Sequence, residues 1–598
     1  MNSPALKATT RPPHDGTLLW PVHKWVLASL FLSHLVACTT STPPGTLGQA
    51  PEAQAYPIPA EAKRESDNAT NNRINREAVS WAQQISDDRG WLFALAELES
   101  LEPGILSSNT ERFIRSQLLW LKGDLIAANS ELSQIFVSSD DGLDLLLGER
   151  QRRAIETGKA IEAAKIALER LRLGFEGPNP ATYSDVFNLL STASEQQIAA
   201  ELRKAEPSSN WASWLSLNRA YRQGRREVMA WRQENRQLPN GLVTMPSGLE
   251  TWLTSDLPSR VAVLLPLSGR LKEAGERVLG GLTEGFFQRY RDSALRPKLI
   301  TVDTEIAGSG QAAYLAALER GADFVVGPLT KERVAELQAL ESRPLPVLAL
   351  NRGTADANLK LTAEKPFLSL SLAPEDEAIQ LASIVWQEGL RNPLLIAPDS
   401  AWGQRMQNAF NTAWRSLGGE VRAATTLTTE VSDNETIATS LATLQSESRI
   451  KQVEKAFEAP VDSQARRRTD IDSIVLLAST PQLAREIRPL LRFHYAGKLP
   501  VYAPSTVYQA ESGIANRDLN GIQFVLPPSA LISDAERSQP LHALGLDAAA
   551  LIDHFDQAVK TRGTLLFGDT GDLSVDNAGN VRRRLKPAVI ARGKARSI

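Results

Sequence analysis

At residue 260 the hydrophobic pattern of this 598-residue chain changes from a helical period to alternating strands and helices. Residues 261–267 read VAVLLPL, a continuous apolar run that is typical of a strand buried on both faces of a parallel sheet. Further strands are expected at 299–302, 323–326 and 346–350, with helical patterns between them. This alternation predicts a doubly wound α/β sheet that begins near residue 259.

The same alternation starts again after Leu368 and predicts a second sheet. The apolar runs at 500–502 and 522–525 are interpreted as strands that cross back to the first sheet. We therefore expect two α/β lobes within residues 259–590, joined by several crossings into a hinged clamp. In such a fold the cleft lies at the carboxyl ends of the strands.

Residues 73–252 show the three- and four-residue spacing of amphipathic helices. One long helix is expected over 150–173, and shorter ones at 195–204 and 211–222. Turn sequences such as Glu102-Pro103-Gly104 separate the helices, and alanines at close-packing positions favour stacked hairpins like those of tetratricopeptide repeats. The strict repeat pattern is not legible, so an irregular helical domain is the alternative.

The N-terminal segment has the layout of a bacterial lipoprotein signal peptide. Scattered cations precede a short apolar run at 25–32, which is followed by Leu35-Val36-Ala37-Cys38. The run is too short to span a hydrocarbon core of about 30 Å as a helix. This ending resembles the lipobox, and Cys38 is the only cysteine in the chain. We predict that residues 1–37 are removed and Cys38 is lipidated; the alternative is an ordinary secretory signal.

Residues 38–72 are rich in Pro, Ala, Thr, Ser, Gly, Gln and Asn, which predicts a flexible tether. Thr39 follows the cysteine where retained inner-membrane lipoproteins would carry Asp, which resembles the pattern of lipoproteins exported to the outer membrane. The expected location is therefore the periplasmic side of the outer membrane, with the protein held there by its lipid.

Composition argues against several classes of function. A net charge of −3 gives no reason to expect nucleic acid as a partner. Six scattered histidines and a single cysteine favour neither a metal site nor a cofactor. SxxK at 448–451 and SDN at 432–434 occur in reverse order for a penicillin-binding enzyme, and no GxSxG or Walker motif is present. We expect a protein that is not an enzyme and uses no cofactor.

Several residues after the strands of the first lobe are candidates for a cleft. Ser268 and Gly269 could cradle an anion at a helix N-terminus, or simply turn and cap the chain. Gly327 permits close backbone approach, and Thr330 and Asn351 supply polar groups after the next strands. The pattern is not that of an amino-acid binder.

Two charged clusters have ordinary interpretations. Glu375, Asp376 and Glu377 open an expected helix and are interpreted as favourable partners of its dipole. The basic residues of 582–596 are interpreted as a solvated terminus, with contact to an acidic partner or to anionic peptidoglycan as the alternative.

Residues 260–275, RVAVLLPLSGRLKEAG, resemble the opening of type I periplasmic-binding proteins, as do residues 325–329, VVGPL. Within that fold the sequence resembles the lipoprotein activators of penicillin-binding proteins, notably at residues 367–378, 399–410 and 541–551. The resemblance covers most of residues 260–590. It implies docking on a class A penicillin-binding protein of the PBP1A type and stimulation of peptidoglycan synthesis. A solute-binding component of a transporter is the alternative, and a wall-modifying enzyme a weaker one.

Overall fold

The computed structural model describes residues 57–59, 73–175, 181–235, 245–290, 296–353, 366–428, 432–457, 462–510, 513–531, 536–560 and 566–598. The predicted signal peptide 1–37, Cys38 and most of the predicted tether 38–72 lie outside the described residues. Within the described ranges, no helix is both long enough and apolar enough to cross a membrane.

The first part of the described chain is helical. Most of these helices begin at a Ser, Thr, Asn or Asp whose side chain accepts a hydrogen bond from the first turn, as Ser194 does from the Gln197 N–H. Most consecutive helices pack against one another. The helices are α1 (Arg76–Arg89), α2 (Trp91–Glu99), α3 (Ser108–Lys122), α4 (Leu125–Ser133), α5 (Asp140–Glu156), α6 (Ala160–Leu173), α7 (Tyr183–Thr192), α8 (Glu195–Lys204), α9 (Asn210–Gln223), α10 (Arg225–Glu234) and α11 (Ser247–Thr254).

The single helix expected over 150–173 is wrong, because the chain breaks between α5 and α6. Gly158 adopts φ +68°, the left-handed conformation that ends helices and that glycine reaches without steric cost. The two halves then fold back on each other as a hairpin.

The first lobe is built on an eight-stranded sheet. Its core order β2-β1-β3-β4-β5 is that of a doubly wound parallel fold, and β13, β12 and β11 extend the β5 edge. The strands are β1 (Arg260–Leu265), β2 (Lys298–Asp303), β3 (Phe324–Val326), β4 (Val347–Ala349), β5 (Phe367–Leu370), β11 (Leu566–Phe567), β12 (Asp572–Val575) and β13 (Asn580–Arg584), with helices α12 (Lys272–Arg289), α13 (Thr304–Ala307), α14 (Gly310–Glu319), α15 (Lys331–Gln338) and α21 (Pro540–Lys560).

The second lobe repeats this order as β7-β6-β8-β9-β10, with antiparallel β14 and β15 added at the β10 edge. The strands are β6 (Pro393–Pro398), β7 (Ala423–Leu427), β8 (Ser473–Leu476), β9 (Val501–Ala503), β10 (Ile522–Leu526), β14 (Lys586–Ala591) and β15 (Lys594–Ser597), with helices α16 (Glu375–Gln387), α17 (Ala401–Ser416), α18 (Asp433–Ser440), α19 (Thr443–Phe457) and α20 (Pro481–Phe493). Strands β9 and β10 therefore belong to the second sheet, and the prediction that they cross back is wrong.

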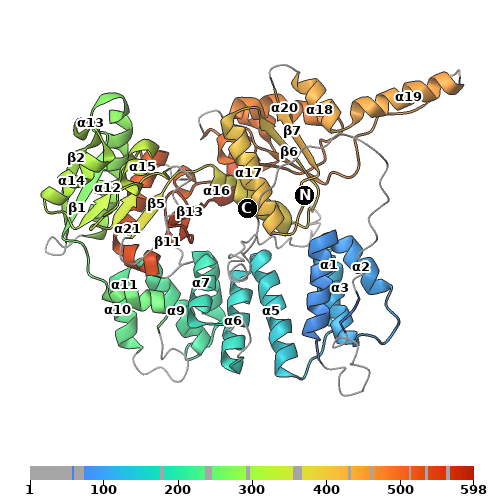
Figure 1. Ribbon diagram of the computed structural model, residues 1–598, viewed down its shortest axis with the longest axis horizontal. Helices are drawn as coiled ribbons and strands as arrows, with labels where there is room; N and C mark the ends of the chain where they lie inside the picture. The colour runs from blue at the N-terminus through green and yellow to red at the C-terminus, as the bar shows by residue number, and fades with distance from the viewer. Residues whose placement is uncertain are drawn as a thin grey trace, which may run out of the picture.

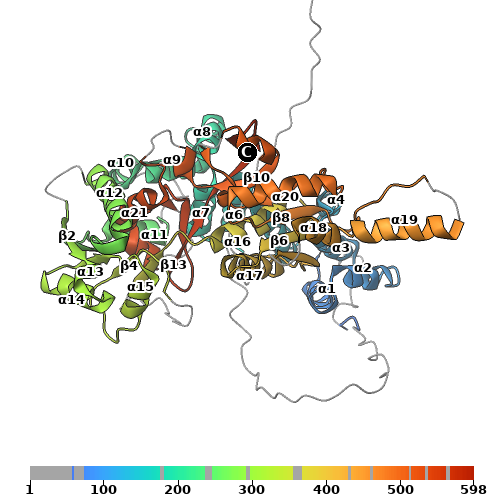
Figure 2. The ribbon, with the colours of Figure 1, turned by 90° about the horizontal axis from the view of Figure 1, so that it is seen from above.

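The chain passes between the lobes three times: from β5 to α16, from β10 to α21, and from β13 to β14 through Leu585. These crossings and the two sheets confirm the predicted two-lobed α/β clamp, preceded by a helical domain. In Figure 1 the helices α1 to α11 form a row beneath both lobes, with α10 and α11 under the first lobe and α1 to α3 under the second. Seen from above, the two lobes lie side by side along the long axis (Figure 2).

The stretch 446–470, whose charge indicates a surface insertion, is half helical. Helix α19 occupies its first part and projects away from the second lobe (Figures 1 and 2). Its last residue, Phe457, is 74% exposed. The rest of the described stretch, from residue 462 onward, contains no helix or strand.

Helices α12 and α21 of the first lobe cross at very short range. A Cβ added to Gly281 would lie 1.9 Å from the His542 carbonyl oxygen, and one added to Gly545 would lie 2.2 Å from the Val278 carbonyl oxygen. Only glycine fits at these two crossing points, because any side chain would overlap backbone that cannot move independently.

We predict that Gly281→Ala destabilises the protein by at least about 3 kcal/mol, since the methyl group forces the two helices apart. The matched control is Gly280→Ala, one residue away on the same helix, where the Cβ would meet His542 Nδ1 at an ordinary 3.7 Å. That change should be neutral or stabilise by up to about 1 kcal/mol, because alanine favours a helix. Urea unfolding of both variants checks this, and equal stability of the two would contradict it.

Candidate functional site

The predicted cleft residues lie at the carboxyl ends of three strands of the first lobe. Ser268 and Gly269 follow β1, Gly327 and Thr330 follow β3, and Asn351 follows β4. The Asn351 amide nitrogen donates to the Leu329 carbonyl at 3.0 Å, which links the loops after β3 and β4. The fold therefore brings these residues to one edge of the sheet.

The polar side chains in this group already have partners within the protein. Thr330 caps α15 by accepting from the Arg333 N–H at 3.4 Å. Burial would raise the pKa of Asp303, but hydrogen bonds from the Ser268 side chain and from nearby backbone N–H groups hold it below its ordinary value. These contacts stabilise the loops themselves. A ligand site at this edge stays a prediction.

The two glycines of this edge have different roles. Gly327 is buried with φ +100°, and a Cβ there would lie 2.2 Å from the Leu264 carbonyl oxygen, so the backbone passes directly over β1. Gly269 is exposed with φ +67°, and its nearest neighbour would be Glu305 at 3.7 Å. Close backbone approach is thus required at Gly327, whereas Gly269 only turns the chain.

The crossing region between the lobes is held by a buried ion-pair network around Asp376. This residue opens α16 in the second lobe and is 4% exposed. Its carboxylate accepts from Arg352 at 2.9 Å and from Arg582 at 3.0 Å, and both arginines belong to the first lobe. A buried carboxylate with two guanidinium partners is stabilised only while all three groups stay together, so the network resists separation of the lobes.

The other acidic residues of that cluster also bind specific partners. Glu375 pairs with Arg405 at 2.8 Å, and the buried Glu377 accepts from the Ser505 N–H at 2.7 Å and from its hydroxyl at 3.0 Å. Burial raises the pKa of Glu377 above its ordinary value. The cluster does open a helix, as predicted, but its contacts reach well beyond that helix.

Gln380 fixes the last crossing. Its side-chain amide donates to the Leu585 carbonyl at 2.9 Å and accepts from the Leu585 N–H at 3.0 Å. Leu585 is the single residue between β13 and β14. The side chain therefore holds both backbone groups of the crossing residue as a neighbouring strand would.

The prediction of a solvated basic terminus is wrong for residues 582–586. Arg583 is 7% exposed and donates to the Ala373 carbonyl at 3.1 Å. Asp572 binds Arg584 at 2.9 Å and Lys586 at 3.0 Å. Asp572 lies 12 residues before Arg584, on the neighbouring strand β12, and only the pairing of β12 with β13 brings the two side chains together.

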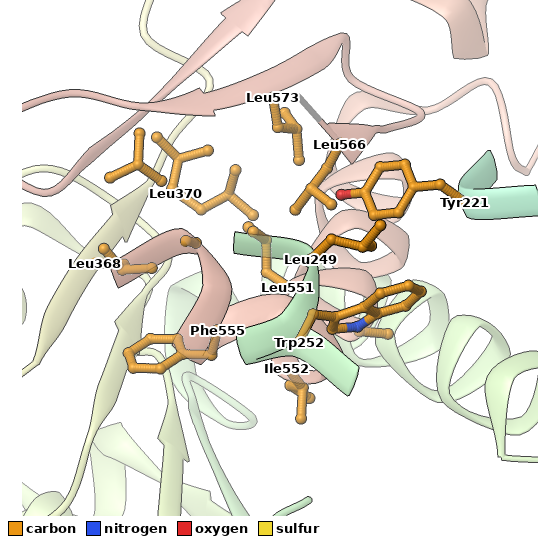
Figure 3. Close-up of a cluster of buried hydrophobic side chains, with 14 of the residues drawn as sticks. Tyr221, Leu249, Trp252, Leu368, Leu370, Leu551, Ile552, Phe555, Leu566 and Leu573 are labelled. Atoms are coloured by element: carbon orange, nitrogen blue, oxygen red, sulfur yellow. The ribbon is translucent and has the colours of Figure 1, made fainter. Parts of the chain in front are cut away.

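The later part of the helical domain, from Ala154 to Leu253, shares one apolar core with the first lobe. In Figure 3, Trp252 from the helical domain lies near Leu551 and Ile552 of α21, and Tyr221 lies on the Leu566 side of the same cluster. Trp252 stacks on His554 with ring centroids 4.4 Å apart, and its Nε1 donates to Asp553 at 3.1 Å. The contact is thus both apolar and hydrogen-bonded.

A second junction joins the helical domain to the second lobe through Arg391. The guanidinium lies 3.6 Å from the centre of the Trp386 ring and donates to the carbonyls of Trp120 at 3.0 Å and Leu121 at 3.1 Å, at the end of α3. Burial lowers its pKa to about 10. Cations bind favourably at the carbonyl end of a helix and over a tryptophan face.

Beside this arginine two turns approach closely. Gly123 ends α3 with φ +93°, and a Cβ there would lie 2.4 Å from the Gly389 carbonyl oxygen. The helical domain therefore contacts the first lobe near α11 and the second lobe near α3. It forms a brace across both lobes.

Among the described residues, no group of three or more His, Cys, Asp or Glu side chains is arranged to hold a metal ion. The crossing network and the two junctions are the polar sites on which the described structure shows the most contacts between its parts.

These features define a class of protein: two α/β lobes in the order of type I periplasmic-binding proteins, both bound to an N-terminal helical domain. Residues 145–592 match the family described as LppC putative lipoprotein, and the chain belongs to this family. The family resemblance expected from the sequence is confirmed.

Two curated relatives are named penicillin-binding protein activator LpoA. The one from Photobacterium profundum is 28% identical over 471 residues, covering 73% of this chain and 74% of the relative. The one from Vibrio antiquarius is 29% identical over 380 residues, covering 59% and 61%. A crystal structure of full-length LpoA from Haemophilus influenzae superposes with a TM-score of 0.50 at 21% identity, covering 90% of this chain and 95% of that one, so the fold is shared.

The junction with the first lobe should make stability depend on pH. Burial lowers the pKa of His554 from 6.5 to about 4. Between these two pH values the imidazole is protonated in the unfolded chain and neutral in the folded one. Stability contributed by neutral His554 is complete above pH 6.5 and is lost as the pH falls towards 4, a loss of about 3 kcal/mol.

The measurement is the difference in unfolding free energy between the wild type and His554→Phe at pH 7 and pH 4. Phenylalanine keeps the stack on Trp252 and cannot titrate. Asp547, whose pKa is raised to about 7, titrates in the opposite direction but cancels in this difference. A difference that does not change with pH would contradict the prediction.

The junction with the second lobe can be tested at Gly123. We expect Gly123→Ala to separate α3 from the Gly389 turn and to speed hydrogen exchange in residues 386–391. The matched control is Gly174→Ala, also at a helix end with φ +68° but with nothing within 4 Å of the added Cβ. Both variants carry the left-handed strain of about 1–2 kcal/mol, so only the contact differs. Equal exchange in both variants would count against a brace at this point.

Proposed function

We propose that this protein is an outer-membrane lipoprotein that docks on a class A penicillin-binding protein of the PBP1A type and stimulates peptidoglycan synthesis without catalysing a reaction itself. The observation that carries the proposal is the likeness to an activator relative over 471 residues, 73% of this chain, which is longer than the two lobes and so reaches into the helical domain.

The geometry favours an adaptor over the alternative, a solute-binding component of a transporter. A receptor closes on its ligand by rotating one lobe against the other. Here the helical domain binds both lobes, through His554 in the first and Arg391 in the second. Closure would have to break one junction or bend the row of helices.

Activation by docking requires that the docked protein bind the active conformation of the synthase more tightly than the inactive one. A coupling free energy of about 1–3 kcal/mol would raise the ratio of active to inactive synthase by a factor of between about five and roughly a hundred. A rigid docking partner serves this purpose, because little of the binding free energy is lost in ordering it.

The proposed membrane anchor is a lipid attached to Cys38. On this proposal the lipid holds Cys38 in the outer membrane, and residues 38–72 let the helical row and the lobes reach the wall. Peptidoglycan itself is a further proposed contact. The Cys38→Ser chain is expected to leave the membrane fraction while keeping its effect on the synthase in solution.

The test is the rate of glycan polymerisation and crosslinking by the class A synthase of the same cell, assayed on lipid II with and without the full chain. We expect a several-fold increase together with capture of the synthase on immobilised protein. Thermal-shift measurements on the full chain with small polar solutes test the alternative, a solute-binding component of a transporter.

Arg391→Met loosens the brace, and Arg415→Met, an exposed arginine on α17, is the matched control. A smaller stimulation by the first variant alone is expected if a fixed arrangement of the lobes matters. No capture and no rate change with the wild type would refute the activator function.

A further inference from the structure

Helix α20 of the second lobe carries three arginines on one face. Arg485, Arg488 and Arg492 are spaced three and four residues apart, so their side chains leave the helix on the same side. The helix packs against the segment that follows β9, which contains the short helices η2 (Ser505–Val507) and η4 (Ala515–Leu519).

Arg488 is buried there without a partner. It is 6% exposed, and its Nε and Nη1 atoms are buried with no hydrogen-bond partner. The Nε and Nη2 atoms of Arg485 are also buried with no hydrogen-bond partner. No ion pair within the described residues involves either side chain. Burial lowers the pKa of Arg488, and the positive charge of Arg492 lowers it further.

Two other buried arginines of this protein are neutralised by carboxylates, and buried Arg343 donates to three carbonyl groups. Arg153 binds Glu149 at 2.8 Å, and Arg584 binds Asp572 at 2.9 Å. An unpaired buried cation is strongly destabilising, so proteins retain one where something else supplies the opposite charge. A guanidinium presents a planar fork of N–H donors that matches two oxygens of one carboxylate or phosphate.

We propose that this face of α20 is a binding site for an oxyanion, a carboxylate or a phosphate, held by the guanidinium groups of Arg488 and Arg485. Arg492, which is exposed, lies at the same face and adds attraction for the approaching anion. The site lies in the second lobe, away from the predicted cleft residues of the first lobe. It does not depend on the proposed function.

The test is isothermal titration of the full chain with inorganic phosphate and, in a separate arm, with acetate, together with melting temperatures in both anions. We expect saturable binding of at least one anion at one site. Arg488→Met should weaken that binding at least about tenfold, as expected for losing charge-assisted hydrogen bonds. The matched control Arg415→Met should leave it unchanged.

Without anion, Arg488→Met should melt no lower than the wild type, because it removes an unpaired buried charge. Arg485→Met, at a half-buried position, is a second variant that should weaken binding even if the first one folds poorly. The stronger of the two arms identifies phosphate or carboxylate as the natural chemistry.

Two results would overturn the site. One is the absence of saturable binding in both arms, or equal binding by wild type and both variants. The other is a crystal structure in phosphate in which Arg488 donates only to water, or to the Asn516 Oδ1 atom, which itself lacks a hydrogen-bond partner in η4.

Discussion

Burial of helix α21 on all sides is the constraint on which the rest of the structure depends. The helix's own side chains from Ala543 through Ala558 are mostly apolar or small and nearly all are buried. Such a helix is stable only when every face is covered. Helix α12 and the sheet of the first lobe cover part of it, and α11 of the helical domain covers another part. The later helices of the helical domain and the first lobe therefore form one folding unit with a common core, whereas the first helices have clusters of their own.

The second lobe is attached to this unit by polar contacts of high specificity. Asp376, Gln380 and Arg391 each bind partners on another part of the molecule, and each is largely withdrawn from water. Such contacts fix geometry more than they add stability, because most of their electrostatic gain offsets desolvation. The result suits a protein whose lobes are held at one angle to present a surface.

The elements of the lobes could be predicted because buried parallel strands read as apolar runs, such as 261–267. The break at Gly158 could not, since helix-favouring residues lie on both sides of it. The cleft residues were placed correctly at the strand ends, but their hydrogen bonds depend on loops that sequence leaves open. The ion pair between Asp376 and Arg582 was not predicted, because the two residues lie 206 positions apart and no local sequence pattern indicates that they meet.

The strands β13 and β14 have a consequence for how the molecule is made. β13 pairs with β5 through Asn580 and Ser369, and β14 pairs with β10, so one short segment closes an edge in each lobe. Until a growing chain has delivered this segment, β5 and β10 are open edges that can recruit foreign strands. Both lobes therefore mature together and late, and nascent chains that stop before residue 580 should be prone to aggregate rather than to form one finished lobe.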